Sequence, residues 1–476
     1  MKDGKNLIKN TTIYALGDIV PRILGFISFP ILTRYLSPAD YGIVNYVSTL
    51  TTFLLAFGFL CINTYYLVFY YRCKDSIEQK KLLGNLSSFV ILFNFFLVVL
   101  SLLFGKSLFS LLGSKISFFP YILIGVLTNF FSIFGVLPSA LYRLLEKPLL
   151  LTLLTISKGL LILILTLVLV IYYDYSAIGV LYANLLVNFI YAFIFIYISR
   201  NYIIWNLDFN KIKEALYFSL PLLPGSLAYY ITTISDRVLI DRFLSLADLG
   251  IFSTAVTLAL ILNIFSYGAY KAFEPYLFKN WGSHGFLKIF ESIRNAFIYV
   301  LLIGVLCLSV FSKEFFQIMS GAKFREAYLY VPLIIIGVYS SSISMLYGTV
   351  ITAKGKTKIN SLVSIVGATI SISLNITLLP ILGLLSAAIV SSLALTVELC
   401  ILMWYSKLEV NHKKPLFSVI IVGLSTCFLV YFLRIDHILI SIIVKFFSII
   451  VVIIALSKVL GINPFKIVDK LTEKTI

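Results

Sequence analysis

The sequence predicts an all-α polytopic membrane protein with about fourteen transmembrane helices. Hydrophobic residues make up 60% of the 476 residues and charged residues only 12%, with a mean hydropathy of +1.02, which lies far from the composition of soluble domains. Apolar runs of about 20 residues recur along the chain, and each is long enough as a helix to cross a hydrocarbon core of about 30 Å. The longest polar stretches, near 200–214 and 273–292, are too short to bury a core of their own.

Hydropathy windows of about 19 residues place each expected span. We expect spans near 11–33, 43–66, 83–104, 118–141, 149–172, 176–199, 216–235, 249–271, 293–312, 328–352, 359–380, 383–405, 415–433 and 438–456. An even number of spans puts both termini on one side of the membrane. The basic start MKDGKNLIKN precedes a full-length span without a small-residue cleavage pattern, so we expect no signal peptide.

The distribution of the positive charge decides between two explanations of the net charge of +17. With the N-terminus inside, the inner segments hold 25 of the 38 Lys and Arg residues, the outer segments nine and the spans four. This is the positive-inside bias of membrane proteins, applied loop by loop. The charge therefore orients the helices and meets anionic membrane lipids, which excludes nucleic acid as a partner and predicts that both termini are cytoplasmic.

A stretch of eleven residues occurs twice, as TRYLSPADYGI (33–43) and DRFLSLADLGI (241–251), with seven identical positions at an offset of 208. Each copy follows an odd-numbered span and leads into the next one, so the copies have the same direction through the membrane. An offset of six spans therefore predicts a parallel repeat about an axis along the membrane normal. EKP (146–148) and GKT (355–357), at an offset of 209, give weaker support.

The repeated residues have a structural interpretation of their own. Ser37 and Ser245 are expected to cap the following helices, with Asp40 and Asp248 as their capping-box partners. Gly42, like its counterpart in the second copy, permits close approach of another helix. We interpret these residues as well-formed turns, and the duplication itself as the informative feature.

The repeat predicts the domain organisation. We expect an N-terminal six-helix lobe (1–200) and a C-terminal six-helix lobe (215–406), joined by a cytoplasmic amphipathic linker (201–214) that lies on the inner membrane face. The remaining residues, 407–476, form an extra helix pair, spans 13 and 14, and a basic cytoplasmic tail.

TRYLSPADYGIVNY near the N-terminus and SLPLLPGSLAYYITTISDRVLIDRFLSLADLGIFSTA (219–255) resemble the polysaccharide-transporter family of the multidrug/oligosaccharidyl-lipid/polysaccharide (MOP) exporter superfamily, whose known members are Wzx-like oligosaccharide flippases. The resemblance covers the whole chain in the number of expected spans, and these two regions in their amino-acid sequence. It implies a MATE-like pair of six-helix lobes around a central cavity that opens alternately to the two membrane faces.

The resemblance also implies a function. The cargo of the family that the chain resembles is an oligosaccharide repeat unit on undecaprenyl diphosphate. It is moved from the cytoplasmic to the outer leaflet of the bacterial inner membrane for O-antigen (lipopolysaccharide), capsule or exopolysaccharide synthesis. A polysaccharide polymerase and a chain-length regulator are the protein partners that such a role implies. The sequence leaves open which glycan is carried and whether an ion is coupled.

Ionisable residues deep in spans are costly and usually face a cavity or a partner. Arg22 in the first span and Lys158 in the fifth are expected to line a cationic cavity and contact the diphosphate, because Arg and Lys bind phosphate oxygens. Asp18, four residues before Arg22, either pairs with that arginine or, by analogy with related drug exporters, forms a proton or sodium site. Lys445 in span 14 is expected to extend to the membrane surface or to line a groove for a lipid tail.

Four charged residues at the outer end of the seventh span form a candidate gate. They are Asp236, Arg237, Asp241 and Arg242. Local ion pairing at the membrane rim is the simpler interpretation and the one we favour from sequence.

Two other classes of protein remain as alternatives. A lipid II flippase has the same expected architecture, and a cation-coupled multidrug exporter would favour acidic cavity residues. An enzyme is not expected, because no outer loop is large enough to hold a glycan and the three histidines, His284, His412 and His437, adjoin no nucleophile or carboxylate pair. The five cysteines are expected to pack in or beside spans, and no metal or cofactor site is predicted.

Overall fold

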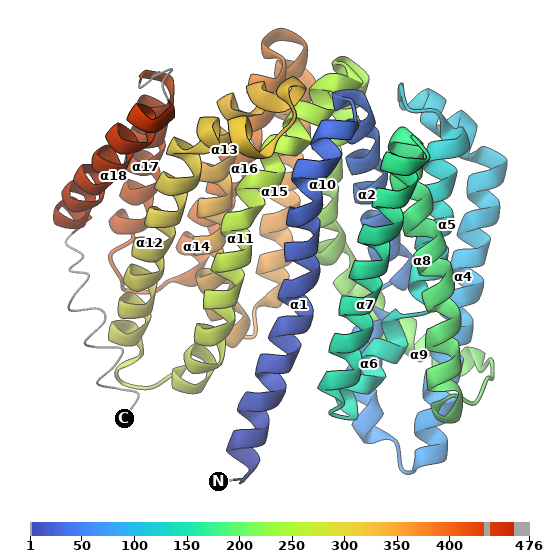
Figure 1. The fold of residues 1–476 in the computed structure, drawn as a ribbon. Helices are drawn as coiled ribbons and strands as arrows, with labels where there is room; N and C mark the ends of the chain where they lie inside the picture. The colour runs from blue at the N-terminus through green and yellow to red at the C-terminus, as the bar shows by residue number, and fades with distance from the viewer. Residues whose placement is uncertain (1, 433–437, 461–476) are drawn as a thin grey trace. The chain divides into compact units, whose positions relative to one another are not determined.

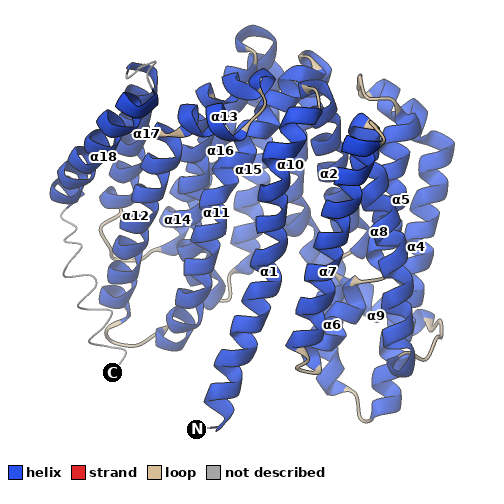
Figure 2. Ribbon diagram, in the orientation of Figure 1, coloured by secondary structure: helices blue, strands red, loops and turns tan. Residues whose placement is uncertain are grey.

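The computed structural model describes residues 2–432 and 438–460, and within these ranges its regular elements are helices joined by loops, with no strand, as predicted (Figures 1 and 2). It divides into two compact units, residues 1–250 and 251–476. The first contains α1 (Lys2–Tyr35), α2 (Pro38–Phe59), α3 (Ile62–Phe69), η1 (Tyr70–Arg72), α4 (Ser76–Leu111), η2 (Phe118–Ile122), α5 (Leu123–Ile133), α6 (Val136–Leu144), α7 (Pro148–Leu167), η3 (Val168–Tyr172), α8 (Ser176–Ser199), η4 (Arg200–Tyr202), α9 (Phe209–Ser219), η5 (Leu220–Leu222) and α10 (Leu223–Phe243).

The helix α11 (Leu246–Asn280) crosses the boundary between the units. The second unit continues with α12 (Phe286–Val310), α13 (Ser312–Met319), η6 (Ala322–Leu329), α14 (Val331–Ala353), α15 (Thr357–Leu382), α16 (Leu384–Ser406), α17 (Lys413–Phe432) and α18 (Ile438–Leu460).

Each expected span coincides with helical structure, and eleven of the described helical segments are long and apolar enough to cross a membrane. The chain is therefore a multi-pass membrane protein. The helices α1 and α10 are not among the eleven, and α18 contributes only a shorter apolar segment, Ile440–Ala455. Both α1 and α10 carry charged residues within an otherwise apolar sequence, so the count of fourteen spans stays a prediction.

The boundary between the units falls after the seventh expected span, not before it. The sequence repeat placed α10 in the C-terminal lobe, whereas α10 packs on α2 and belongs to the first compact unit. The assignment of residues 1–200 and 215–406 to two lobes stays a prediction.

The linker between the sixth and seventh expected spans packs against the first unit. Residues 203–208 are extended along α4, where Asn85 Nδ2 donates to the Asp208 carbonyl (3.2 Å) and the Asp208 amide donates to Asn85 Oδ1 (2.8 Å). Asp208 then caps α9, which buries Ala215 in a core shared with α3, α4 and α6 and exposes Phe209. The predicted amphipathic segment is therefore a helix with one face docked on the protein.

The expectation for Lys445 was wrong. Its side chain is only 2% exposed, and its ammonium donates to both carboxylate oxygens of Glu314, at 2.8 and 2.9 Å. The hydroxyl of Ser441, one turn earlier on α18, donates to the same carboxylate. A hydropathy window records the lysine but not the acidic residue on α13 that neutralises it.

Candidate functional site

The first unit encloses a polar cavity of about 330 Å³ between α2, α5, α7 and α8. Hydroxyl and amide groups from three of these helices line it together with one lysine. Its polar lining residues are Ser48, Thr51, Thr52, Thr128, Ser132, Lys158, Asn184 and Asn188. None of the described lining residues is acidic, so the cavity carries the positive charge of Lys158 without an opposing carboxylate.

Spacing along each helix explains why these side chains meet. Thr128 and Ser132 are four residues apart on α5, and Asn184 and Asn188 are four apart on α8, so each pair occupies one helix face. Thr128 and Ser132 donate to the carbonyls of Ile124 and Thr128 of their own helix, both at 2.7 Å. The Thr128 proton is thereby used within its own helix, so the Thr128 oxygen remains as an acceptor on the cavity wall. The single Ser132 proton is shared between the Thr128 carbonyl and Asn188 Oδ1, and the Ser132 oxygen also remains able to accept.

The ammonium of Lys158 is held by an amide. Lys158 Nζ donates to Asn188 Oδ1 at 2.7 Å, and the Ser132 hydroxyl donates to the same oxygen from 2.8 Å. The ammonium also lies 5.9 Å from the centre of the Tyr191 ring. Within residues 2–432 and 438–460, no carboxylate forms a salt bridge with Lys158.

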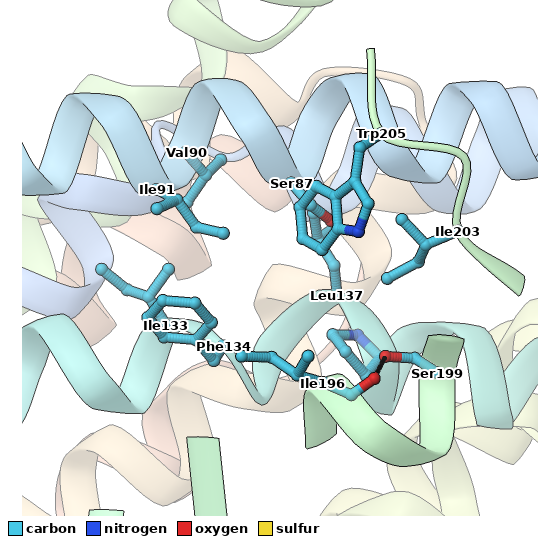
Figure 3. Close-up of a pocket in the computed structure, with 11 residues that line it drawn as sticks. Ser87, Val90, Ile91, Ile133, Phe134, Leu137, Ile196, Ser199, Ile203 and Trp205 are labelled. Carbon is cyan, nitrogen blue, oxygen red and sulfur yellow. Dashed lines mark hydrogen bonds between the residues drawn. The ribbon is translucent and has the colours of Figure 1, made fainter. Parts of the chain in front are cut away.

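A second pocket in the first unit is too small to be a ligand site. It lies where the linker crosses α4, with Trp205 and Ile203 facing Ser87 and apolar residues of α5, α6 and α8 (Figure 3). Its volume is about 20 Å³, the space of roughly one water molecule. Its lining is apolar apart from two serines, so we assign it to packing.

The structure separates the residues predicted for one cavity. Lys158 lines the cavity, whereas Arg22 is exposed on α1 and is not among the described lining residues. Pro21 and Leu24, on either side of Arg22, face α7: a Cβ added at Gly159 would lie 3.7 and 3.2 Å from them. The backbone of Asp18 is helical, but its side chain lies outside the described part of the chain.

The four candidate gate residues differ in their environment. Asp236 and Arg237 are buried, and Arg237 Nη1 donates to the Thr233 carbonyl at 2.7 Å. Arg242 is exposed and its guanidinium lies 5.7 Å from the centre of the Phe243 ring. Arg237 and Arg242 therefore each contact a neighbouring part of their own helix, α10.

Asp241 is the exception. It is fully buried and accepts hydrogen bonds from Ser114 Oγ (2.5 Å) and from the Lys115 amide (3.1 Å), both in the loop after α4. The Lys115 ammonium in turn donates to the Leu244 carbonyl. Asp241 thus binds the end of α10 to a loop of the first repeat. It does not form the local ion pair with Arg242 that we favoured from sequence.

The two copies of the repeated motif are in direct contact. Both capping boxes are present, with the Asp40 amide donating to Ser37 Oγ (3.1 Å) and the Asp248 amide to Ser245 Oγ (3.0 Å), which confirms the predicted turns. We call the contact between Pro38, Gly42, Leu246 and Gly250 the repeat joint.

The repeat joint is reciprocal. A Cβ added at Gly42 would overlap the carbonyl oxygen of Leu246, and a Cβ added at Gly250 would overlap the carbonyl oxygen of Pro38. Each glycine therefore packs on the turn that precedes the other. The predicted close approach is confirmed, and its partner is the second copy of the same motif.

Sequence reasoning found Lys158 but missed its neighbours. Asn184, Asn188, Thr128 and Ser132 were not singled out, although polar residues four apart in an otherwise apolar span are a recognisable signal of a polar helix face. Which helices bring such faces together depends on tertiary packing and could not be inferred.

Comparison with known proteins identifies the family. The model of the family described as "Polysaccharide biosynthesis protein" matches residues 7–281, more than half of the chain. The chain belongs to this family. One relative is the capsular polysaccharide biosynthesis protein CapF of Staphylococcus aureus. It is 23% identical to this chain over 412 residues, which cover 84% of this chain and 99% of CapF.

Two solved structures share the fold of this member of the polysaccharide biosynthesis family. The lipid II flippase MurJ, in an inward closed conformation, matches with a TM-score of 0.70 and 16% identity over 94% of this chain and 98% of MurJ. An inward-facing MATE family multidrug resistance transporter of the MOP superfamily matches with a TM-score of 0.66 and 12% identity, over 83% and 97% of the two chains. At these identities the likeness concerns the fold, which agrees with the resemblance in the sequence.

Proposed function

We propose that this protein is a flippase that moves undecaprenyl-diphosphate-linked oligosaccharide repeat units from the cytoplasmic to the outer leaflet of the bacterial inner membrane. The observation that carries the proposal is the cavity of the first unit, where an unneutralised lysine faces walls rich in hydroxyl and amide groups. Sugar hydroxyls need such hydrogen-bond partners, and a diphosphate needs a cation. The family and the name of CapF support polysaccharide synthesis as the process served.

The cavity also bears on the alternatives. A cation-coupled multidrug exporter would favour acidic cavity residues; the described lining residues carry a lysine, and the Asp18 side chain lies outside the described residues. A lipid II flippase would meet the same demand for an anion site, and the fold likeness to MurJ keeps it as the second candidate. Within the proposal, Arg22 contacts the diphosphate from α1 at another stage of the cycle.

Reconstituted transport tests the proposal. In proteoliposomes, we expect Lys158→Ala to lower the rate of lipid-linked oligosaccharide flipping by roughly tenfold or more, since a charge-assisted hydrogen bond is worth about 1.5–3 kcal/mol. A smaller loss is expected for Arg22→Ala. Lys106→Ala removes an exposed lysine of α4 outside the cavity and serves as the control. Equal rates for Lys158→Ala and the control, or faster flipping of lipid II than of oligosaccharide carriers, would contradict the assignment.

The membrane potential provides a driving force for this cargo. An inside-negative potential favours outward movement of an anion by about 2.3 kcal/mol per charge per 100 mV. We expect the flipping rate to rise when valinomycin and potassium impose an inside-negative potential on the liposomes, without any added ion gradient. A rate that ignores the potential but follows a proton or sodium gradient would instead assign ion-coupled exchange.

We further propose that the repeat joint closes the outer side of the transport path. With the N-terminus inside, both copies of the motif lie at the outer membrane face. Asp241 with Ser114 and Lys115 adds a second contact between repeats at the same end of α10. Alternating access then requires both contacts to separate when the cavity opens outward.

A further inference from the structure

The side chain that fixes Lys158 is itself fixed in one orientation. Asn188 is 5% exposed, and its Nδ2 donates to the Asn184 carbonyl at 2.8 Å. Its Oδ1 accepts from both Lys158 and Ser132. Rotating the amide by half a turn would place its NH₂ group against the Lys158 ammonium and its oxygen against the Asn184 carbonyl, so the oxygen is held toward Lys158.

This arrangement leaves the charge of the ammonium uncompensated toward the cavity. An ammonium has three N–H donors, and among the described residues Asn188 is its one hydrogen-bond acceptor. An aspartate in the same place would hold the ammonium equally well but would cancel its charge. An amide positions the lysine and leaves both its charge and two of its donors for a ligand.

We propose that Asn188 is a positioning residue that presents the Lys158 ammonium to an oxyanion of the cargo. The inference rests on the proposed function and adds the ligand chemistry of this subsite: a phosphate or a sugar carboxylate, bound by Lys158 and flanked by the acceptor walls of α5 and α8. The acceptor oxygens of Thr128 and Ser132 would then bind hydroxyl groups beside the anion, since they repel the anion itself.

Two substitutions at position 188 separate positioning from a structural role. Asn188→Asp keeps the shape and the acceptor for Lys158 and Ser132, whereas Asn188→Ala removes both. Each variant loses the Nδ2 donor to the Asn184 carbonyl, so that loss does not distinguish them. If Asn188 served packing alone, the near-isosteric aspartate would be the milder change. Because the proposal depends on charge, we expect the opposite order, with aspartate the more harmful variant.

Binding to the purified full-length protein measures this order directly. With inorganic diphosphate and glucuronate as probes in isothermal titration, we expect Asn188→Asp to weaken binding of the preferred probe by at least about tenfold, as loss of a charge-assisted contact implies. Asn188→Ala should weaken it by only a few-fold. Lys158→Gln alone should weaken binding about as much as Asn188→Asp, because each substitution removes the net positive charge of the pair.

The outcomes distinguish this inference from the proposed function. Stronger binding of diphosphate assigns the anion to the lipid linkage, and stronger binding of glucuronate assigns it to the glycan. If Asn188→Ala bound the anion more weakly than Asn188→Asp, with both variants folded by size-exclusion chromatography, the positioning role would be overturned. The proposed flippase function would not be affected. Normal anion binding by a protein that flips no carrier in liposomes would instead reject the proposed function alone.

Discussion

Replacing Lys445 with methionine is expected to lower the free energy of unfolding by about 3–5 kcal/mol, the cost of leaving a buried charge without its partner. Lys445 and Glu314 are only 2% and 4% exposed, and the lysine donates to both carboxylate oxygens. In Lys445→Met, Glu314 keeps one hydrogen bond, from Ser441, and loses its counter-charge. Thermal and denaturant unfolding in detergent would measure the loss.

A double variant and a surface pair provide the controls. Lys445→Met with Glu314→Gln removes both charges and should recover most of the lost stability. Lys211→Met breaks the ion pair with Glu214, whose side chains are 52% and 46% exposed, and should cost less than about 1 kcal/mol. If Lys445→Met and Lys211→Met proved equally mild, the Glu314 and Lys445 pair would not be buried as described.

Local features of this fold could be predicted from the sequence. Hydropathy located helical segments, eleven of which are long and apolar enough to cross a membrane, because burial in lipid acts on each segment separately. The capping boxes at Ser37 and Ser245 follow from residues three apart, and the duplication of the motif predicted that its glycines approach another helix closely. Each of these inferences needs only neighbouring residues or a repeat.

Tertiary features could not be predicted in the same way. Asn188 and Ser132 meet Lys158 from two other helices, and Glu314 meets Lys445 across 131 residues of sequence. An isolated charge in a span indicates that a partner or a cavity exists, but not which. Hence Lys158 was placed in a cavity by its charge alone, whereas the same reasoning failed for Lys445, whose partner lies outside its own helix.

Replacing Gly250 with leucine is expected to reduce transport to the background rate. The added side chain meets the carbonyl group and the Cα of Pro38, which are backbone atoms, so α11 or the start of α2 has to move. Overpacking of this kind costs about 1–3 kcal/mol or more. Because leucine is a better helix former than glycine, a loss cannot be attributed to the helix itself.

The same helix offers a matched control. A Cβ added at Gly268 of α11 meets no atom within 4 Å, so Gly268→Leu should retain transport and keep or slightly raise the stability of the protein. Equal transport by the two leucine variants would show that the repeat joint does not need close backbone contact.

Accessibility tests whether the joint is a closure and not only a packing contact. In a background without the five native cysteines, Ser48→Cys places a thiol in the lining of the cavity. If the repeat joint closes the outer side, Gly250→Leu holds it apart, and a membrane-impermeant thiol reagent added outside should label Cys at position 48 several-fold faster than in the parent. Unchanged labelling together with lost transport would mean that the leucine acts by distorting the turn, because an open joint exposes the cavity whether or not transport proceeds.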